Sequence, residues 1–395
     1  MDKKVTFIII LICCASFKMV AQKDTIIQLE EVVIPSYKLK KYSKGYSYKT
    51  IKDSLVERNP SSLTDVLRFN SFIYFKENGN GMISSPSFRG TTASQTAVLW
   101  NGININSQLN GQVDFNTIGN NSLDEISVRN GGGSVLFGSG AIGGTVHLNN
   151  NIEFKRNQKH TLSLGFGSFN TQQLHYKTKI SSAKFYFDVG LGTNKSDNNF
   201  RFLGTNTFND NGDYYNGNFD VNLGYKINAK NSLKFYSNIF ISDRNLSRTL
   251  TAPSLSKYKD KTYRSLVEWN SFLNSKEVIT TRVAYLFQEF KYFENRLNSD
   301  IFSTGETNSK ILNIDYKKVF SRNIQLSAIL GVEQNNGNGD NLENKSRSIY
   351  SSVLVFDHKL NNNISYNVQL RKEFLKEYSA PFVYSLGLEY IINNN

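Results

Sequence analysis

The strongest constraint on the fold is an alternation of apolar and polar residues that runs from about residue 154 to the last residues of the chain. Every second side chain is apolar in Thr161–Phe166. The same pattern recurs, with few interruptions, at 185–191, 219–225, 233–241, 312–316, 324–332, 364–370 and 384–390. A period of two places apolar side chains on one face of a β-strand and polar ones on the other. We expect about twelve antiparallel strands.

The connections between these strands are of two kinds. Short ones lie at 181–184, 228–231, 321–323 and 361–363, and long polar ones at 193–213, 243–261, 293–306 and 333–347. Short turns at one edge and long loops at the other are typical of an antiparallel sheet that crosses a membrane. With 39% hydrophobic residues, thinly spread, the chain lacks the runs of about twenty that helical membrane spans need. The sequence therefore predicts a mainly β protein, a transmembrane antiparallel β-barrel with its apolar face toward lipid.

The first 21 residues have the features of a secretory signal peptide: an early basic pair, Lys3 and Lys4, an apolar stretch, and small residues before the expected cleavage. Both cysteines, Cys13 and Cys14, lie inside it. The net charge of +13 has no accompanying basic run, zinc-ligand spacing or RNA-binding motif, so nucleic acid is not expected as a partner. An exported basic protein is instead expected to meet outer-membrane lipid and lipopolysaccharide.

Three further zones follow the signal. Residues 22–48 form a Lys-rich lead with one apolar patch, Leu29, Glu30, Glu31, Val32, Val33 and Ile34, which ends at Pro35. Residues 49–151 have the pattern of a mixed α/β domain, with short strands expected at 72–75, 96–100, 126–128 and 145–148. Ser62 and Asp65 have capping-box spacing and predict a helix that starts at Ser61 or Ser62. Residues 152–395 carry the barrel strands.

No constellation for catalysis stands out. Gly138, Gly140 and Gly143 have the spacing of a dinucleotide-binding loop, but a strand-like segment follows them and no acidic residue lies about twenty positions on. The glycine density from 131 to 144 instead predicts backbone packed tightly against a neighbouring surface. The four histidines lack metal-ligand spacing, so we expect no enzyme and no required cofactor.

Four segments in order, Ser87–Gly90, Val98–Ile103, Ile126–Val128 and Gly131–Val146, resemble the plug domain of TonB-dependent outer-membrane receptors. The order and spacing of the four pieces make the resemblance specific. Gly132 departs from it, because the family usually has proline there. The residues that match the family motif are Arg89, Gly90, Asn101, Gly102, Gly131, Ser134, Gly138, Ala141, Gly143 and Gly144.

The resemblance gives the lead a role. Leu29–Ile34 resembles the TonB box, which family members offer to the TonB energy-coupling complex as an added strand; docking on the plug is the alternative. The resemblance also implies a barrel of roughly twenty-two strands around the plug. With about twelve strands the chain is interpreted as the amino-terminal half of a receptor, truncated or split.

By this resemblance the chain is a receptor of the cell outer membrane for energised uptake of a scarce small nutrient. Similarity to the cobalamin-type receptors makes cobalamin one candidate cargo, and ferric siderophore or haem is the other. Asp210 and Asp213, in Asn209–Asp213, are candidate Ca²⁺ ligands, with a solvated Asn-Gly turn as the simpler interpretation. A passive small β-barrel channel or a surface adhesin is the alternative function.

Overall fold

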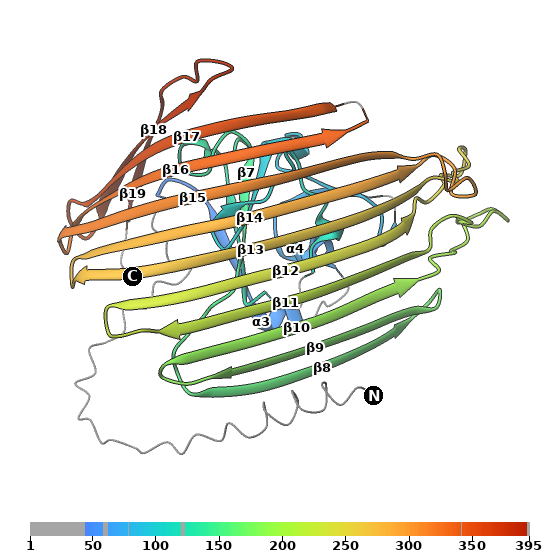
Figure 1. Ribbon diagram of the computed structural model, residues 1–395, viewed down its shortest axis with the longest axis horizontal. Helices are drawn as coiled ribbons and strands as arrows, with labels where there is room; N and C mark the ends of the chain where they lie inside the picture. Colours follow the sequence, from blue (N-terminus) through green and yellow to red (C-terminus); the bar gives the residue numbers. More distant parts are fainter. Residues whose placement is uncertain (1–43, 58–61, 78, 120–122, 341, 393–395) are drawn as a thin grey trace, which may run out of the picture. The chain divides into compact units, whose positions relative to one another are not determined.

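The structure is a computed structural model of the 395-residue chain. It describes residues 44–57, 62–77, 79–119, 123–340 and 342–392 (Figure 1). The predicted signal peptide, 1–21, and the apolar patch Leu29–Ile34 lie outside the described residues. Within these ranges, no helix has the length and apolar character needed to cross a membrane. The fold is mainly β, as predicted.

The segment predicted to be the plug contains a five-stranded sheet, here called the plug sheet, in the order β1-β6-β7-β4-β5. β4 and β7 run parallel, and the other neighbours run antiparallel. The same segment also contains a separate two-stranded hairpin, β2–β3. The bounds are β1 Tyr48–Lys52, β2 Tyr74–Glu77, β3 Ser84–Ser87, β4 Thr96–Trp100, β5 Ile103–Asn104, β6 Glu125–Asn130 and β7 Gly144–Asn149. The short helices are α3 Asp53–Glu57, α4 Leu63–Asn70, η1 Ala93–Gln95, η2 Phe115–Thr117 and α5 Ser134–Phe137.

The predicted helix is α4, and its start is set by Ser62. The Ser62 side chain accepts a hydrogen bond from the Asp65 backbone N–H at 3.0 Å, which satisfies one of the free donors of the first turn. Behind this cap, Leu63, Val66 and Leu67 share the buried face of the helix.

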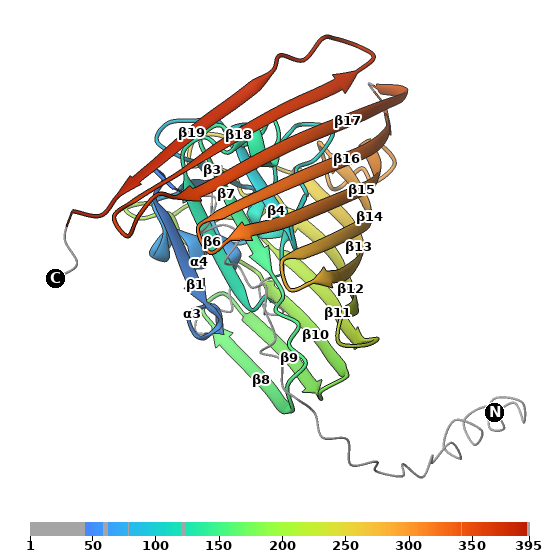
Figure 2. The ribbon, with the colours of Figure 1, turned by 90° about the vertical axis from the view of Figure 1, so that its left-hand side faces the viewer.

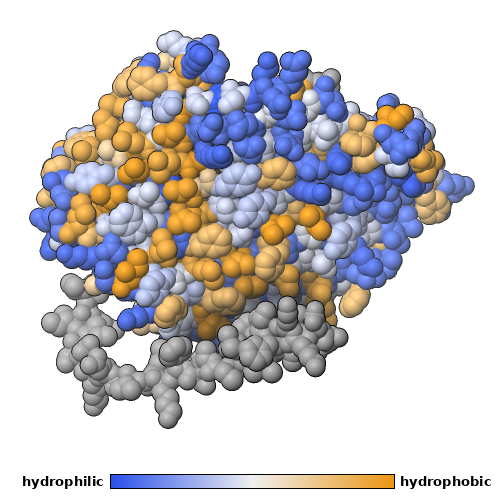
Figure 3. Space-filling model, viewed as in Figure 1, coloured by the Kyte–Doolittle hydropathy of each residue, from blue (hydrophilic) through white to orange (hydrophobic). Residues whose placement is uncertain are grey.

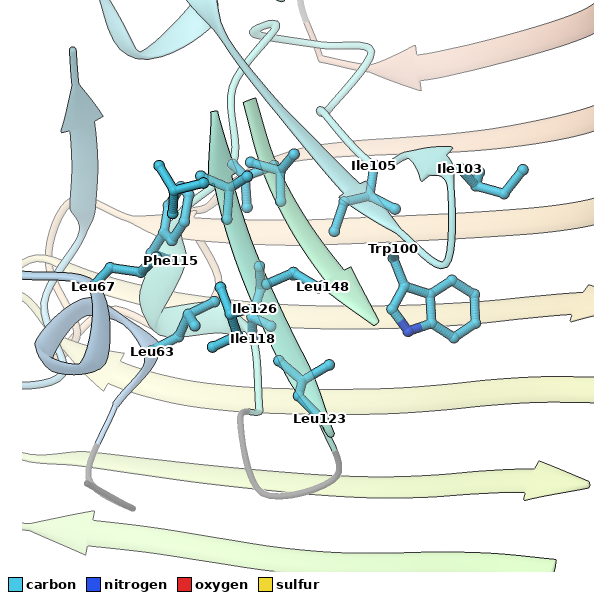
Figure 4. Close-up of a cluster of buried hydrophobic side chains, with 14 of the residues drawn as sticks. Leu63, Leu67, Trp100, Ile103, Ile105, Phe115, Ile118, Leu123, Ile126 and Leu148 are labelled. Carbon is cyan, nitrogen blue, oxygen red and sulfur yellow. The ribbon is translucent and has the colours of Figure 1, made fainter. Parts of the chain in front are cut away.

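The plug has a hydrophobic core, formed by α4, η2 and one face of the plug sheet. Figure 4 shows Leu63 and Leu67 near Phe115, with Ile126 and Leu148 beside them. The same core continues into side chains of the large sheet that surrounds it. Trp100 of β4, for example, meets the Tyr236 ring edge-on, with centroids 6.4 Å apart.

The large sheet has twelve strands, each hydrogen-bonded to its neighbours in sequence order and antiparallel to them. This confirms the predicted number and arrangement. β8 and β19 are its two edges, and the sheet curves around the plug strands (Figure 2). Its strands are β8 Asn157–Gly167, β9 Thr171–Ser181, β10 Phe185–Ser196, β11 Tyr214–Lys226, β12 Asn231–Asn245, β13 Lys257–Asn274, β14 Glu277–Phe293, β15 Ser303–Ser321, β16 Ile324–Gly339, β17 Leu342–Lys359, β18 Ile364–Leu375 and β19 Val383–Tyr390.

The two faces of the large sheet differ as the alternation predicts. Val267 and Val283 face each other across β13 and β14, and both point outward, with Val283 54% exposed. Asp188 and Asn222, also cross-strand partners, point inward, toward the plug, and are buried. Figure 3 shows apolar and aromatic residues across the middle of the outer face and hydrophilic ones toward the strand ends. The outer face suits hydrocarbon, and the inner face suits polar contacts.

One predicted connection is wrong. The long loop expected at 333–347 is strand instead, because β16 continues to Gly339 and β17 starts at Leu342. Asn335 and Asn336 pair across the ladder with Arg347 and Ser346. Backbone hydrogen bonds form the ladder, so a run of Asn and Gly can extend a hairpin where propensity predicts a loop.

The orientation of the outer face predicts how the protein responds to a charge. Val283→Arg should lower the free energy of unfolding in lipid vesicles by about 2–4 kcal/mol, because the guanidinium would face the middle of the bilayer. Glu289→Arg, on the same face of β14 but closer to the long-loop end, should cost about 1 kcal/mol or less. Urea titrations of the two variants measure the difference, and equal costs would contradict the assigned orientation.

Candidate functional site: the plug and its contacts with the large sheet

Two of the predicted motif pairs form tight turns. Arg89 and Gly90 have φ angles of +48° and +83°, and Asn101 and Gly102 have φ angles of +48° and +86°. Positive φ at both central positions is the geometry in which Asn-Gly is favoured. The Asn101 side chain also fastens the turn to the chain after β7, because its Nδ2 donates to Asn150 Oδ1 at 2.9 Å and its Oδ1 accepts from the Asn150 N–H at 2.8 Å.

The glycine-rich motif holds a compact loop around α5. Gly131 and Gly138 have φ angles of +83° and +89°, and Ser134 begins the helix that Gly138 ends. A Cβ at Gly144 would lie 2.7 Å from the Arg129 carbonyl oxygen, and one at Gly143 would collide with the Thr91 side chain. At Gly143 and Gly144 the surface against which this backbone packs therefore belongs to the plug itself, whereas at Gly138 the nearest atom belongs to Arg371 of β18. Ala141, in the same loop, is fully buried.

The plug is joined to the large sheet by a buried arginine. Arg244 on β12, only 1% exposed, donates from Nη1 to Asp114 Oδ2 of the plug at 2.7 Å and from Nη2 to Asp260 Oδ2 of β13 at 2.6 Å. One guanidinium thus pairs with a carboxylate from each side of the boundary. Its planar fork suits this double contact better than a lysine would.

Asp114 uses its second oxygen inside the plug. Oδ1 accepts from the backbone N–H groups of Ser84 at 2.9 Å and Asn116 at 3.0 Å, and so links β3 to the start of η2. The carboxylate therefore couples the plug's internal loops directly to Arg244.

A second polar contact lies at the short-turn end of β9. Lys177 and Lys179, two residues apart and both facing inward, each donate to Asp124 Oδ1 at 2.9 Å. Asp124 Oδ2 accepts from the Asn151 backbone N–H at 2.8 Å. Burial works to raise the pKa of Asp124, but the two ammonium groups hold it below the usual value. Asp124 is therefore ionised at neutral pH and fixes the last plug segment to β9.

A third contact lies at the long-loop end. Gln108 of the plug donates to Glu333 on β16 at 3.3 Å and accepts from Arg347 Nη2 on β17 at 2.7 Å. Together the three contacts attach the plug to β9, β12, β16 and β17 through polar side chains.

A small cavity of about 70 Å³ lies between the plug and β9–β12. Its polar lining includes Asn80 of the plug and His175, Asn194 and Asn216 of the large sheet. Neither ring nitrogen of His175 has a hydrogen-bond partner among the described residues. A polar cavity of this size has room for one or two water molecules.

The candidate calcium ligands are engaged with other side chains. Asp210 Oδ2 accepts from Arg248 at 3.3 Å, and Asp213 Oδ1 accepts from Asn245 at 2.7 Å. The described residues contain no group of three or more His, Cys, Asp or Glu arranged to hold a metal ion. Calcium at this loop stays a prediction. The alternative, a solvated turn, is wrong, because Asn209 and Asn211 are buried.

Comparison with known proteins supports the interpretation of this site. A family model described as TonB-dependent Receptor Plug Domain matches residues 41–145. Over 146 residues the chain is 32% identical to the vitamin B12 transporter BtuB of Vibrio cholerae serotype O1. This match covers 36% of this chain and 23% of that protein. Residues 41–145 therefore match the plug domain of TonB-dependent receptors, and the chain is similar to these receptors in sequence and fold. With a matching plug and part of a barrel, it is a protein of the cell outer membrane.

Solved structures of receptors agree with the fold. The siderophore receptor PirA from Acinetobacter baumannii matches with a TM-score of 0.69 at 14% identity, over 90% of this chain and 60% of that one. FpvA of P. aeruginosa matches with a TM-score of 0.71 at 13% identity, over 89% of this receptor chain and 55% of FpvA. The matched part thus spans less than two thirds of each of these relatives.

The ion-pair contact at Arg244 gives a prediction for the stability of this chain. Arg244→Met should lower the free energy of unfolding by about 3–5 kcal/mol, because Asp114 and Asp260 would stay buried without their cation. Arg248→Met, four residues further along, removes only a more exposed pair with Asp210 and should cost about 1 kcal/mol or less. Urea titration in lipid vesicles compares the two variants, and similar losses would contradict the role given to Arg244.

Proposed function

We propose that the receptor serves energised uptake of a scarce nutrient across the outer membrane. The observation that carries the proposal is the way in which the plug is held against the inner face of the large sheet. The plug occupies the inner face of the large sheet and shares a hydrophobic core with it, yet it has a five-stranded sheet of its own, and buried ion pairs such as Arg244–Asp114 and Lys177–Asp124 hold it there. Such contacts can be broken and remade, because charged side chains regain solvation when they separate.

The same seating argues against the alternative, a passive channel. A passive channel needs an open lumen, whereas here polar inward side chains such as Asp188 and Asn222 are buried beneath the plug. Under the proposal the plug must be displaced for cargo to pass, and the displacement needs work from outside. No covalent chemistry and no resident cofactor take part, and calcium in the loop at Asp210 and Asp213 would only stabilise that loop.

The work would come from the TonB energy-coupling complex through Leu29–Ile34. Support comes from the sequence, since Val32, Val33 and Ile34 favour extended backbone and Pro35 ends the segment. The patch also precedes β1, the edge strand of the plug sheet. A force on the patch would therefore reach the plug through its first strand. Outer-membrane lipid and lipopolysaccharide are the proposed surroundings of the apolar outer face.

Cobalamin is the favoured cargo. The relatives at 30–32% identity carry the name vitamin B12 transporter. Ferric siderophore or haem is second, because siderophore receptors such as PirA match at 14% identity and share the fold alone.

The coupling role predicts a strand-dependent interaction. A peptide covering Leu29–Ile34 should capture the coupling protein from periplasmic extract, and Val32→Pro should abolish capture, because proline removes a ladder donor. A scrambled peptide of the same composition is the control. Capture that survives Val32→Pro, or no capture at all, would favour the channel or adhesin alternative.

The cargo assignment has its own test. In native outer-membrane vesicles the receptor should retain radiolabelled cyanocobalamin, and unlabelled cobalamin but not a ferric siderophore or haem should displace it. Vesicles from a deletion strain provide the background. Saturable binding of a ferric siderophore or haem without cobalamin binding would overturn the assignment and leave the uptake proposal standing.

A further inference from the structure

Arg129 on β6 is a buried cation without a hydrogen-bonded partner in the described chain. Its side chain is 1% exposed, and Nε, Nη1 and Nη2 all lack an acceptor among the described residues. Its neighbour His147 is neutral and does not compensate the charge, because burial, and after it the Arg129 charge, lowers the pKa of His147 to about 3. An isolated charge in such a place is strongly unfavourable.

The side chain that covers this charge belongs to the lead. The Arg129 guanidinium carbon lies 4.0 Å from the centroid of the Tyr46 ring, within the range of a cation–π contact. Gly131, with a φ of +83°, makes room for the ring, since a Cβ there would lie 3.2 Å from Tyr46. Arg129 and Gly131 of the plug thus form a binding surface for the Tyr46 ring of the lead.

The lead around Tyr46 is held from two sides. Toward the large sheet, Lys44 Nζ lies 3.1 Å from Asp357 of β17, and the Tyr46 hydroxyl lies 3.4 Å from Ser385 Oγ of β19. Toward the plug, the Ser47 carbonyl accepts from the Asn130 N–H at 2.9 Å. Displacement of the lead from this place would take the ring away from the guanidinium.

We infer that Tyr46 is a positioning residue, whose contact with Arg129 holds β1 of the plug sheet against β6. We call this contact the latch. While the lead is seated, its ring stabilises the Arg129 charge and keeps β1 on β6. When the lead is withdrawn, the charge loses this contact and the β1–β6 pairing weakens. The inference rests on the proposed function only for the source of the pull, namely the coupling protein; the contact and its effect on β6 are properties of the chain.

The latch can be tested by the accessibility of a single thiol. The two natural cysteines, Cys13 and Cys14, lie in the predicted signal peptide, and Ser127 is 2% exposed on β6 opposite Thr50 of β1. In a Ser127→Cys background, a water-soluble maleimide should react slowly in outer-membrane vesicles. Adding Tyr46→Leu should raise the labelling rate about tenfold, the effect expected for loss of a cation–π contact with a half-buried ring.

Three further variants separate the latch from general loss of packing. Tyr46→Phe keeps the ring and should label within about twofold of the parent. Tyr48→Leu changes a tyrosine two residues along the same segment that is 36% exposed, and should also leave the rate unchanged. Arg129→Met combined with Tyr46→Leu should return the rate toward that of the parent, because no charge is left to cover.

Equal rates for Tyr46→Leu and Tyr46→Phe would overturn the inference, as would a double variant that labels as fast as Tyr46→Leu alone. If Arg129→Met does not accumulate in the membrane, the comparison of Tyr46→Phe with Tyr46→Leu decides. The measurement needs no coupling protein, so its outcome is separate from that of the peptide capture. A receptor that failed to bind the coupling protein could still show the latch.

Discussion

The register of the large sheet is the constraint on which the other contacts depend. Because side chains alternate along each strand, a slip of one residue would turn every inward polar group toward lipid. The observed register sets Val267 opposite Val283 on the outside and Asp188 opposite Asn222 on the inside. Arg244 can reach the plug only because it belongs to the inward set of β12.

Much of the fold could be predicted from the sequence, because its signals are local. Alternation at 161–166 and later segments identified the strands of the large sheet, and the Ser62–Asp65 spacing located the start of α4. The stretch 333–347 was mispredicted as a loop because Asn and Gly favour turns locally, while pairing with neighbouring strands made it a hairpin. Here tertiary hydrogen bonding overrode propensity.

The candidate site was predicted only in part. The motif residues Arg89, Asn101 and Gly138 were identified through the resemblance to the plug family, and the structure shows that all three have positive φ inside the plug, the first two in turns and Gly138 at the end of α5. Arg244 and Asp114 were missed because they are 130 residues apart, and no local pattern marks them as partners. A charge at an inward strand position, as in Lys177 and Lys179, is a weak signal, since such positions also suit side chains that merely face water.

The plug is attached to the large sheet by different kinds of contact on different sides, because it shares a hydrophobic core with only some of the strands. Inward Tyr236, Leu266 and Ile311 belong to the same hydrophobic cluster as the plug interior, so separation there would expose apolar surface to water. Around the described part of the lead, from residue 44 on, the contacts are polar and include an ion pair, a hydroxyl contact, a backbone hydrogen bond and one covered guanidinium. Under the proposed function, a pull on the lead would therefore separate polar contacts first and leave the apolar contact with β12–β15 in place.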